Sequence, residues 1–399
     1  MLRSRGRVIW IILDGVGLEA LPDAKAYGDE GAATLPHVAS ACGGLNLPNL
    51  QHLGMGNLAE IEGVPPLASP CGVYGRLAER SAGKDSIVGH WELTGVVLEE
   101  PFATYPQGFP DDLVAAFAKI AGVQPLGNVP ASGISILKEY GAEHIKTGRP
   151  ILYTSVDSVF QIAAHEEILP PEELYKLCHL AKPLVDTYNI ARVIARPFVG
   201  TEQEGFRRTP RRKDFPALPP QRTLLEGLTD NNYTVSAVGK ICDLFAGRGI
   251  SRSVTSVNNA DGMNKTLTEL TALDEGLLMV NLIDFDMAYG HRKDAAGFGK
   301  ALEEFDAWLP LLYEQMQTDD LLVISADHGC DPTTPGSDHT REYVPVLVWS
   351  KSMRGGVELG DRESFADLGA TLGAYFDIPA LTAGESFLDA IDLNGEIKL

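Results

Sequence analysis

The sequence has few cysteines, and their spacing does not suit disulfides or zinc. Only five cysteines occur among 399 residues, they are widely spaced, and none belongs to a C-x-x-C pair. An odd number without close pairs argues against a disulfide framework or a zinc knuckle and favours a reducing compartment. Long apolar runs are also missing: residues 8–13 are too few for a signal peptide, and no segment approaches the roughly 18–20 apolar residues of a membrane span. We therefore predict a soluble, cytoplasmic protein.

Positive charge is scarce as well. The chain has 33 lysines and arginines against 54 aspartates and glutamates, and its formal net charge is -21. Such an acidic chain repels nucleic acids and anionic membranes, so we predict neither as a partner. A small phosphorylated substrate remains compatible, because a local cluster of arginine, lysine and metal ions overrides the net field at short range. We predict no obligate protein partner.

Three short apolar runs predict the central strands of the fold. They cover residues 8–13, 277–283 and 321–325 and do not alternate with polar residues. Such runs are typical of strands buried on both faces of a parallel sheet; buried helix segments are the competing interpretation, but the runs are short and rich in valine and isoleucine. Helical spacing of apolar residues occurs between the runs, as in residues 295–316. The alternation predicts a doubly wound α/β core.

The middle of the chain has a pattern of its own. Residues 150–154 and 191–195 are strand candidates, and residues 171–188 between them are a helix candidate. Prolines mark both edges of this region, as breaks between structural units often do: Pro101, Pro106, Pro110, Pro216, Pro219 and Pro220. We predict an inserted α/β domain over residues 99–220, and a core domain formed by residues 1–98 and 221–399.

A carboxylate follows each of the three apolar runs. Asp14 follows the first, Asp284 and Asp286 follow the second, and Asp327 follows the third. In an open α/β sheet the ligand crevice lies at the carboxyl ends of the strands, so these side chains are expected to converge. A single aspartate after a strand is commonly a turn or cap residue. Carboxylates from three strand ends repel one another unless a cation neutralises them, and this predicts a metal site.

Histidines add nitrogen donors to this edge. His291, His328 and His339 follow the second and third runs. Oxygen and nitrogen ligands without thiolate suit Mn2+ or Zn2+, and Mg2+ is less suited to the histidine-rich position. A pair of such ions stabilises the attacking and leaving oxygens of a displacement at phosphorus and lowers the pKa of a coordinated hydroxyl.

That chemistry requires a nucleophile, and Ser86 is the candidate. It lies between Gly83 and Gly89, where the backbone can approach an anion closely. A serine flanked by glycines is by itself more typical of an ordinary loop. The neighbouring metal-ligand pattern favours Ser86 as the carrier of a phosphoryl group.

Taken together, these residues resemble the phosphopentomutases, a family of the alkaline phosphatase superfamily. The matching segments are Leu13-Asp-Gly-Val-Gly17, Gly83-Lys-Asp-Ser-Ile-Val-Gly-His-Trp-Glu92, Asp286-Met-Ala-Tyr-Gly-His291, Asp327-His-Gly-Cys-Asp331, Ser337-Asp-His-Thr-Arg341, Ser155-Val-Asp-Ser-Val-Phe-Gln-Ile-Ala-Ala-His-Glu166 and Ile194-Ala-Arg-Pro-Phe-Val-Gly200. The resemblance runs nearly end to end. The Gly-Lys-Asp-x-x-x-Gly-His-Trp-Glu stretch is its specific part, whereas the Asp and His motifs alone mark only the superfamily.

The resemblance implies an alkaline-phosphatase-like fold and two divalent metal ions, which we expect to be Mn2+. It assigns one ion to Asp14, Ser86, Asp327 and His328, and the other to Asp286, His291 and His339. The family usually has threonine where this chain has Ser86, and both residues offer a hydroxyl. The implied reaction interconverts α-D-ribose 1-phosphate, or its 2-deoxy form, and the 5-phosphate through a phosphoserine and a bisphosphate intermediate. Glucose 1,6-bisphosphate or ribose 1,5-bisphosphate is the expected activator.

Substrate binding is expected to involve the inserted domain, which would also exclude water during transfer. Its basic run, residues 207–213, is either a solvated loop or part of a phosphate site. In the second interpretation Arg208, with Arg196 and Lys240, binds the distal phosphate, and Asp157 binds sugar hydroxyls. The alternatives are a phosphatase, a phosphodiesterase or a cofactor-independent phosphoglycerate mutase of the same superfamily, and, more remotely, a non-catalytic metal- and phosphate-binding protein. The Gly-His-Trp-Glu stretch and the insertion favour the pentomutase.

Overall fold

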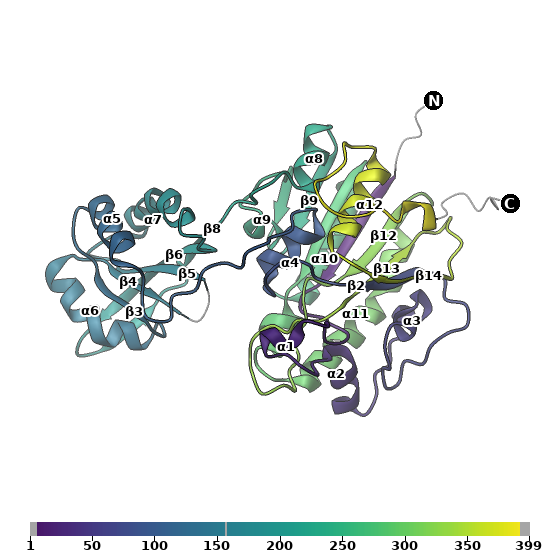
Figure 1. The fold of residues 1–399 in the computed structure, drawn as a ribbon, viewed down its shortest axis with the longest axis horizontal. Coiled ribbons are helices and arrows are strands. Elements are labelled where there is room, and N and C mark those ends of the chain that lie inside the picture. Colours follow the sequence, from purple (N-terminus) through teal and green to yellow (C-terminus); the bar gives the residue numbers. More distant parts are fainter. Residues whose placement is uncertain (1–5, 156–157, 392–399) are drawn as a thin grey trace. The chain divides into compact units, whose positions relative to one another are not determined.

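The computed structural model describes residues 6–155 and 158–391 and divides into two compact units (Figure 1). Unit 1 contains residues 1–100 and 219–399, and unit 2 contains residues 101–218. The divisions expected from the sequence, after residues 98 and 220, fall close to these positions. Each unit has its own sheet with helices packed on it, so the α/β class predicted from the sequence is confirmed.

An eight-stranded sheet forms the centre of unit 1. Its strands are β1 (Arg7–Leu13), β2 (Val73–Leu77), β9 (Thr234–Val238), β10 (Arg252–Val254), β11 (Gly276–Leu282), β12 (Leu321–Ser325), β13 (Val344–Trp349) and β14 (Val357–Arg362). The spatial order is β10-β9-β11-β1-β12-β13-β2-β14. The three apolar runs of the sequence are therefore strands, and they lie side by side in the middle of the sheet.

The sheet is parallel except at one strand. β13 runs antiparallel to both of its neighbours, β12 and β2, while the other pairs are parallel. The expectation of a parallel sheet is thus correct for the three apolar runs and incomplete for the sheet as a whole. Burial determines the apolar pattern of a central strand, and a buried strand has the same pattern in either direction.

The register of the three central strands brings their carboxyl ends to the same level. Leu13, the last residue of β1, pairs with Leu282 at the end of β11. Ile12 pairs with Ser325 at the end of β12. The residues that follow these strands consequently start from one edge of the sheet, where an α/β fold places its ligand site.

Two groups of helices cover this sheet. The helices of unit 1 are α1 (Ala24–Tyr27), α2 (Thr34–Cys42), α3 (Pro48–Leu53), η1 (Met55–Asn57), α4 (Ser86–Leu93), α8 (Leu224–Asp230), α9 (Ile241–Leu244), α10 (Asn259–Ala272), η2 (Phe285–Gly290), α11 (Ala295–Gln315), α12 (Ala366–Phe376) and η3 (Leu388–Ala390). One group packs around α11 and includes α2, α3 and α10; the other includes α4, α8, α9 and α12. Every residue of β1, β11 and β12 is buried, as a doubly wound core requires.

Unit 2 contains a six-stranded mixed sheet. Its strands are β3 (Leu126–Pro130), β4 (Ile151–Thr154), β5 (Val159–His165), β6 (Arg192–Thr201), β7 (Gly205–Arg208) and β8 (Lys213–Pro216), and its helices are α5 (Asp111–Ala121), α6 (Ser135–Thr147) and α7 (Pro171–Asp186). The strand and helix candidates of this region correspond to β4, β6 and α7. Phe109, Phe117 and Phe160 form an aromatic centre under α5 and α7.

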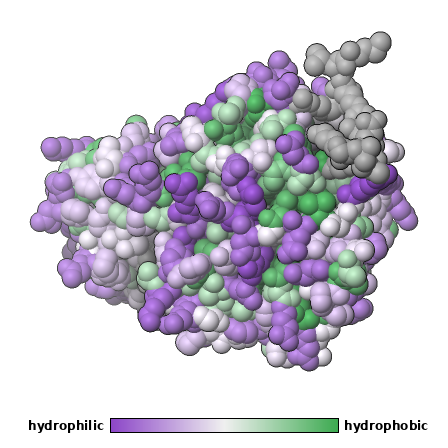
Figure 2. Space-filling model, turned by 45° about the vertical axis from the view of Figure 1, so that its right-hand side comes forward, coloured by the Kyte–Doolittle hydropathy of each residue, from purple (hydrophilic) through white to green (hydrophobic). Residues whose placement is uncertain are grey.

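Among the described residues, no helix combines the length and the apolar character needed to cross a bilayer. Figure 2 shows a face on which hydrophilic side chains are widespread and apolar ones are interspersed. Large exposed apolar side chains come from separate elements, such as Leu180 in α7 and Leu311 in α11. Scattered exposure of this kind is ordinary for a folded protein.

Candidate active site

Three strand ends at the centre of unit 1 carry the predicted carboxylates. Asp14 directly follows β1, Asp327 lies just beyond β12, and Asp286 lies in η2, a π-helical turn after β11. Because the strands are parallel neighbours, these side chains share one edge of the sheet. The turn after β1 requires Gly15, whose φ is 81° and where a Cβ would lie 2.9 Å from the Cβ of Cys330. The convergence predicted from the sequence is therefore present.

One cluster joins Asp14, Asp327 and His328, all of them fully buried. The Nε2 atom of His328 lies 3.5 Å from Oδ1 of Asp14 and 3.3 Å from Oδ2 of Asp327. Ser86 reaches the same nitrogen, because its Oγ lies 3.1 Å from Nε2 of His328. The four residues that the family resemblance assigns to one ion thus meet around a single imidazole.

A second cluster contains Asp286, His291 and His339. The Nε2 atoms of His291 and His339 lie 3.3 Å and 3.5 Å from Oδ1 of Asp286. The ring of His339 also lies 4.2 Å from the ring of His328, measured between centroids. The two clusters are therefore adjacent, and a ring nitrogen of His328 lies within 4.8 Å of donor atoms in both of them.

The donor atoms of both clusters are spaced as the ligands of a cation would be. Both carboxylate oxygens of Asp14 and Oδ1 of Asp286 are buried and accept no hydrogen bond from any described residue, which is rare for buried polar atoms. Two ligands bound at about 2.1 Å in tetrahedral geometry lie about 3.4 Å apart. The separations of 3.3–3.5 Å between carboxylate oxygens and imidazole nitrogens match this value. The residues present therefore fit divalent metal ions.

The side chains of Asp284 and Cys330 belong to neither set of expected ligands. Asp284, which the sequence alone left equivalent to Asp286, accepts a hydrogen bond from the Asn259 N–H at 2.7 Å and so connects the end of β11 to α10. The sulfur of Cys330, which was not among the expected ligands, lies within 4.8 Å of donor atoms of Asp286 and His291. Burial raises the pKa of the Cys330 thiol, which disfavours its thiolate form in the absence of an ion. A soft sulfur ligand is also poorly suited to a hard ion such as Mn2+.

The pKa values at this edge are shifted in opposite directions. Burial and the neighbouring Asp327 raise the pKa of Asp14 to about 6. Burial alone would also raise the pKa of Asp327, but His328 and His90 lower it to about 2. Burial and the adjacent His328 lower the pKa of His339 well below its usual range, which keeps the imidazole neutral. A neutral imidazole is the form that binds a metal.

Ser86 is the first residue of α4, whose N-terminus is capped by the side chain of Asp85. Gly89 allows this helix to lie against the end of β12, since a Cβ there would be 2.0 Å from the carbonyl oxygen of Asp327. The sequence had suggested a role for this glycine in approach to an anion; the structure gives it a packing role. His90 places Nδ1 3.1 Å from Oδ2 of Asp327. Nothing in the local sequence pattern indicated that His90 would contact Asp327, because the two residues are far apart in the chain.

Lys240 is the one predicted substrate residue that belongs to unit 1. Its Nζ lies 3.5 Å from Oδ2 of Asp14. Burial tends to lower the pKa of Lys240, but the carboxylates of Asp14, Asp286 and Asp327 raise it. The side chain therefore remains an ammonium at the edge of the first cluster.

The other predicted substrate residues belong to unit 2. Burial raises the pKa of the Tyr153 phenol. Arg196, Arg208 and Arg212 lie close enough to offset part of this increase. Burial and the neighbouring Arg212 lower the pKa of Arg196, as crowded like charges do. Unit 2 thus has a cluster of positive charge in an otherwise acidic chain. Asp157 lies outside the described residues.

Several known proteins are similar to this chain. The sequence model of the Metalloenzyme superfamily matches residues 6–380. The phosphopentomutase of Syntrophotalea carbinolica is 58% identical over 391 residues, which cover 98% of this chain and 99% of the relative. That of Dictyoglomus thermophilum is 52% identical over 387 residues, which cover 97% and 98%. A solved structure of Leishmania mexicana phosphoglycerate mutase has a TM-score of 0.47 and 11% identity, covering 96% of this chain and 97% of that one.

Proposed function

This chain belongs to the phosphopentomutase family, and from that premise we propose that it interconverts α-D-ribose 1-phosphate and D-ribose 5-phosphate, and the 2-deoxyribose pair, through Ser86. The full-length identity to relatives named phosphopentomutase favours this function over a phosphatase, a phosphodiesterase or a phosphoglycerate mutase. The observation that carries the proposal is the contact between Ser86 and the buried cluster. Its Oγ lies 3.1 Å from Nε2 of His328, beside carboxylate oxygens that have no hydrogen-bond partner among the described residues.

We propose that the two clusters hold two divalent ions, most simply Mn2+. The first ion would be held by Asp14, Ser86, Asp327 and His328. The second would be held by Asp286, His291 and His339. Bound ions of this kind lower the pKa of a coordinated hydroxyl and neutralise charge on a transferring phosphoryl group. The ligand spacing and the mixed oxygen and nitrogen donors support this assignment.

The reaction proceeds in two transfers. Phosphorylated Ser86 gives its phosphoryl group to the free hydroxyl of the sugar monophosphate: a new P–O bond forms at the sugar, the bond to Ser86 Oγ breaks, and the proton of the sugar hydroxyl passes to the Ser86 oxygen. The product is a sugar bisphosphate. Its other phosphoryl group then returns to Ser86, which releases the isomeric monophosphate and restores the phosphoserine. A sugar bisphosphate such as glucose 1,6-bisphosphate or ribose 1,5-bisphosphate would phosphorylate the resting enzyme.

Basic residues are proposed to hold the phosphate groups. Lys240 was expected from the sequence to bind the distal phosphate. Because this ammonium lies beside Asp14, we propose instead that it binds an oxygen of the phosphoryl group that is transferred. Arg196 and Arg208 in unit 2 are proposed to bind the phosphate that is not transferred in a given step, since an anion would relieve the repulsion between these guanidinium groups. Asp157 is proposed to bind sugar hydroxyls. The five cysteines are all unpaired, which supports a cytoplasmic location.

A coupled assay tests the function. Purified chain, Mn2+ and a catalytic amount of glucose 1,6-bisphosphate should convert ribose 1-phosphate into ribose 5-phosphate without release of inorganic phosphate. Release of phosphate in proportion to substrate consumed would instead identify a hydrolase. Neither product would be expected from a non-catalytic binding protein.

A serine variant tests the carrier. Ser86→Ala removes the hydroxyl and should abolish both turnover and the phosphorylated species seen by intact mass. Ser132→Ala, at an exposed serine of unit 2, is the matched control and should retain both. Retained turnover in Ser86→Ala would exclude Ser86 as the carrier.

A further inference from the structure

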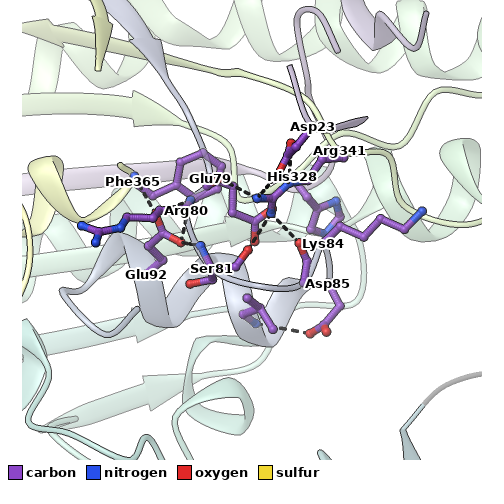
Figure 3. Close-up of polar contacts among 12 residues, drawn as sticks. Asp23, Glu79, Arg80, Ser81, Lys84, Asp85, Glu92, His328, Arg341 and Phe365 are labelled. Atoms are coloured by element: carbon purple, nitrogen blue, oxygen red, sulfur yellow. Dashed lines mark hydrogen bonds and ion pairs between the residues drawn. The ribbon is translucent and has the colours of Figure 1, made fainter. Parts of the chain in front are cut away.

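A short loop leads from β2 to α4 and delivers Ser86 to the first cluster. Its residues, 78–85, are irregular, yet Glu79 and Ser81 within it are buried. Buried backbone groups outside helices and sheets need other hydrogen-bond partners. Two charged side chains from outside the loop, Arg341 and Glu92, supply them (Figure 3).

Arg341 binds the carbonyl groups of the loop. Its guanidinium donates from Nη2 to the Glu79 carbonyl oxygen at 2.7 Å, and from Nη1 to those of Ser81 at 2.7 Å and Gly83 at 2.6 Å. The remaining donors face the carboxylate of Asp23, at 3.0 Å from Nη2 and 3.2 Å from Nε. The residue is only 2% exposed. A planar fork with five donors can hold three carbonyls at once, which a lysine ammonium at the end of a flexible chain cannot reproduce in the same geometry.

Glu92 binds the N–H groups of the same loop. Its carboxylate accepts hydrogen bonds from the backbone of Arg80 at 2.9 Å and of Ser81 at 2.6 Å. It also accepts from the Ser364 hydroxyl at 2.7 Å and the Phe365 N–H at 3.0 Å, at the start of α12. Glu92 belongs to α4, the helix that follows the loop. The loop is therefore fastened to its own helix through its N–H groups and to a distant segment through its carbonyls.

That distant segment also contains a residue of the second cluster. Arg341 follows His339 by two positions in the chain. Its backbone N–H donates to Oδ2 of Asp29 at 3.0 Å, and the same carboxylate accepts from Nζ of Lys84 at 2.9 Å. Two connections thus join the His339 segment to the loop within a few residues of Ser86.

We propose that Arg341 and Glu92 are positioning residues for phosphoryl transfer: by holding the carbonyl and N–H groups of residues 79–83, they fix the Ser86 oxygen relative to both clusters. Neither touches the reacting atoms, and both act through the loop. The inference rests on the proposed function of Ser86. Charge-assisted hydrogen bonds are shorter and stronger than neutral ones, and transfer between two bound groups depends steeply on their alignment.

The test compares Arg341→Lys with Asp23→Asn in folded, metal-loaded enzyme. Arg341→Lys keeps the positive charge but removes the planar guanidinium that binds three carbonyl groups. The kcat should fall on the order of 100-fold, the loss expected when the Ser86 oxygen is displaced by about 1 Å. KM and the metal content should stay unchanged, since the phosphate-binding residues and the ligands are intact. Asp23→Asn removes the partner on the other side of Arg341 and keeps the three carbonyl contacts. Its kcat should stay within about threefold, the size of the loss of one partly exposed ion pair.

A purely structural role predicts different results. It would lower the melting temperature and the yield of folded protein, but would leave kcat per metal-loaded molecule unchanged in Arg341→Lys. An unchanged kcat in Arg341→Lys, or an equal loss of kcat in Asp23→Asn, would overturn the inference. If Arg341→Lys does not fold, Glu92→Gln is the second variant, because Glu92 binds the N–H groups of the same loop. It should lower kcat without changing KM or metal content. An unchanged kcat in Glu92→Gln would also overturn the inference. An unmodified enzyme without mutase turnover would instead refute the proposed function, and with it the premise of this inference.

Discussion

Replacing Glu342 by glutamine should change how the stability of unit 1 depends on pH. The carboxyl group of Glu342 is 1% exposed and accepts hydrogen bonds from Thr34 N–H at 2.8 Å, Thr34 Oγ1 at 2.7 Å and Thr340 Oγ1 at 2.5 Å. Burial raises its pKa from 4.5 to about 7, although these hydrogen bonds lower it. The folded state therefore holds a proton on Glu342 at pH values where the unfolded chain has lost it.

The direction and size of the effect follow from this difference. Between pH 4.5 and about 7 the folded state binds more protons, so the free energy of unfolding decreases as the pH rises through this window. Above it the loss is complete. A shift of about 2.5 units at about 1.4 kcal/mol per unit corresponds to about 3 kcal/mol.

The assay is denaturant unfolding of the unmodified chain and of Glu342→Gln at pH 5 and pH 8, following the transition of unit 1. The neutral amide can accept from the Thr34 N–H and donate to the two threonine oxygens, and it does not titrate. Relative to the unmodified chain, the variant should therefore be more stable at pH 8 than at pH 5, by about 2.5 kcal/mol in the difference, because pH 5 already lies inside the window. Glu62→Gln, at an exposed glutamate, is the control and should follow the unmodified chain. If Glu342→Gln also follows it at both pH values, the carboxyl group titrates normally and the reasoning is wrong.

Two other predictions concern the metal clusters. His339→Ala removes a neutral imidazole whose Nε2 lies 3.5 Å from Asp286, so metal analysis should find one bound ion per chain fewer and the coupled assay should find reduced turnover; an unchanged metal content would discredit the assignment of His339. Cys330→Ser should leave the metal content unchanged, because Asp286, His291 and His339 supply the ligands of the proposed second ion and a soft sulfur ligand is poorly suited to Mn2+. Loss of an ion in Cys330→Ser would show that the sulfur is a ligand.

Local sequence patterns were sufficient for the central strands and for the residues that end them. The runs that became β1, β11 and β12 are apolar along their whole length because both faces of these strands are buried. Asp14 and Asp327 follow their strands in the chain, so their presence at the carboxyl edge required only that the strands be parallel neighbours. The helices α7 and α11 could be predicted for the same reason, since their apolar spacing is local.

The antiparallel direction of β13 and the approach of Cys330 to the second cluster were decided only by the tertiary structure. The same holds for Arg341, which binds carbonyl groups of a loop about 260 positions earlier in the chain. The family resemblance already selected Asp286 over Asp284, and the structure adds the contact of Asp284 with Asn259. Each of these contacts joins segments that are distant in sequence. A periodic pattern reports which face of one element is buried, but it does not report which distant side chain lies against that face, and that is fixed only when the sheet order and the loops are in place.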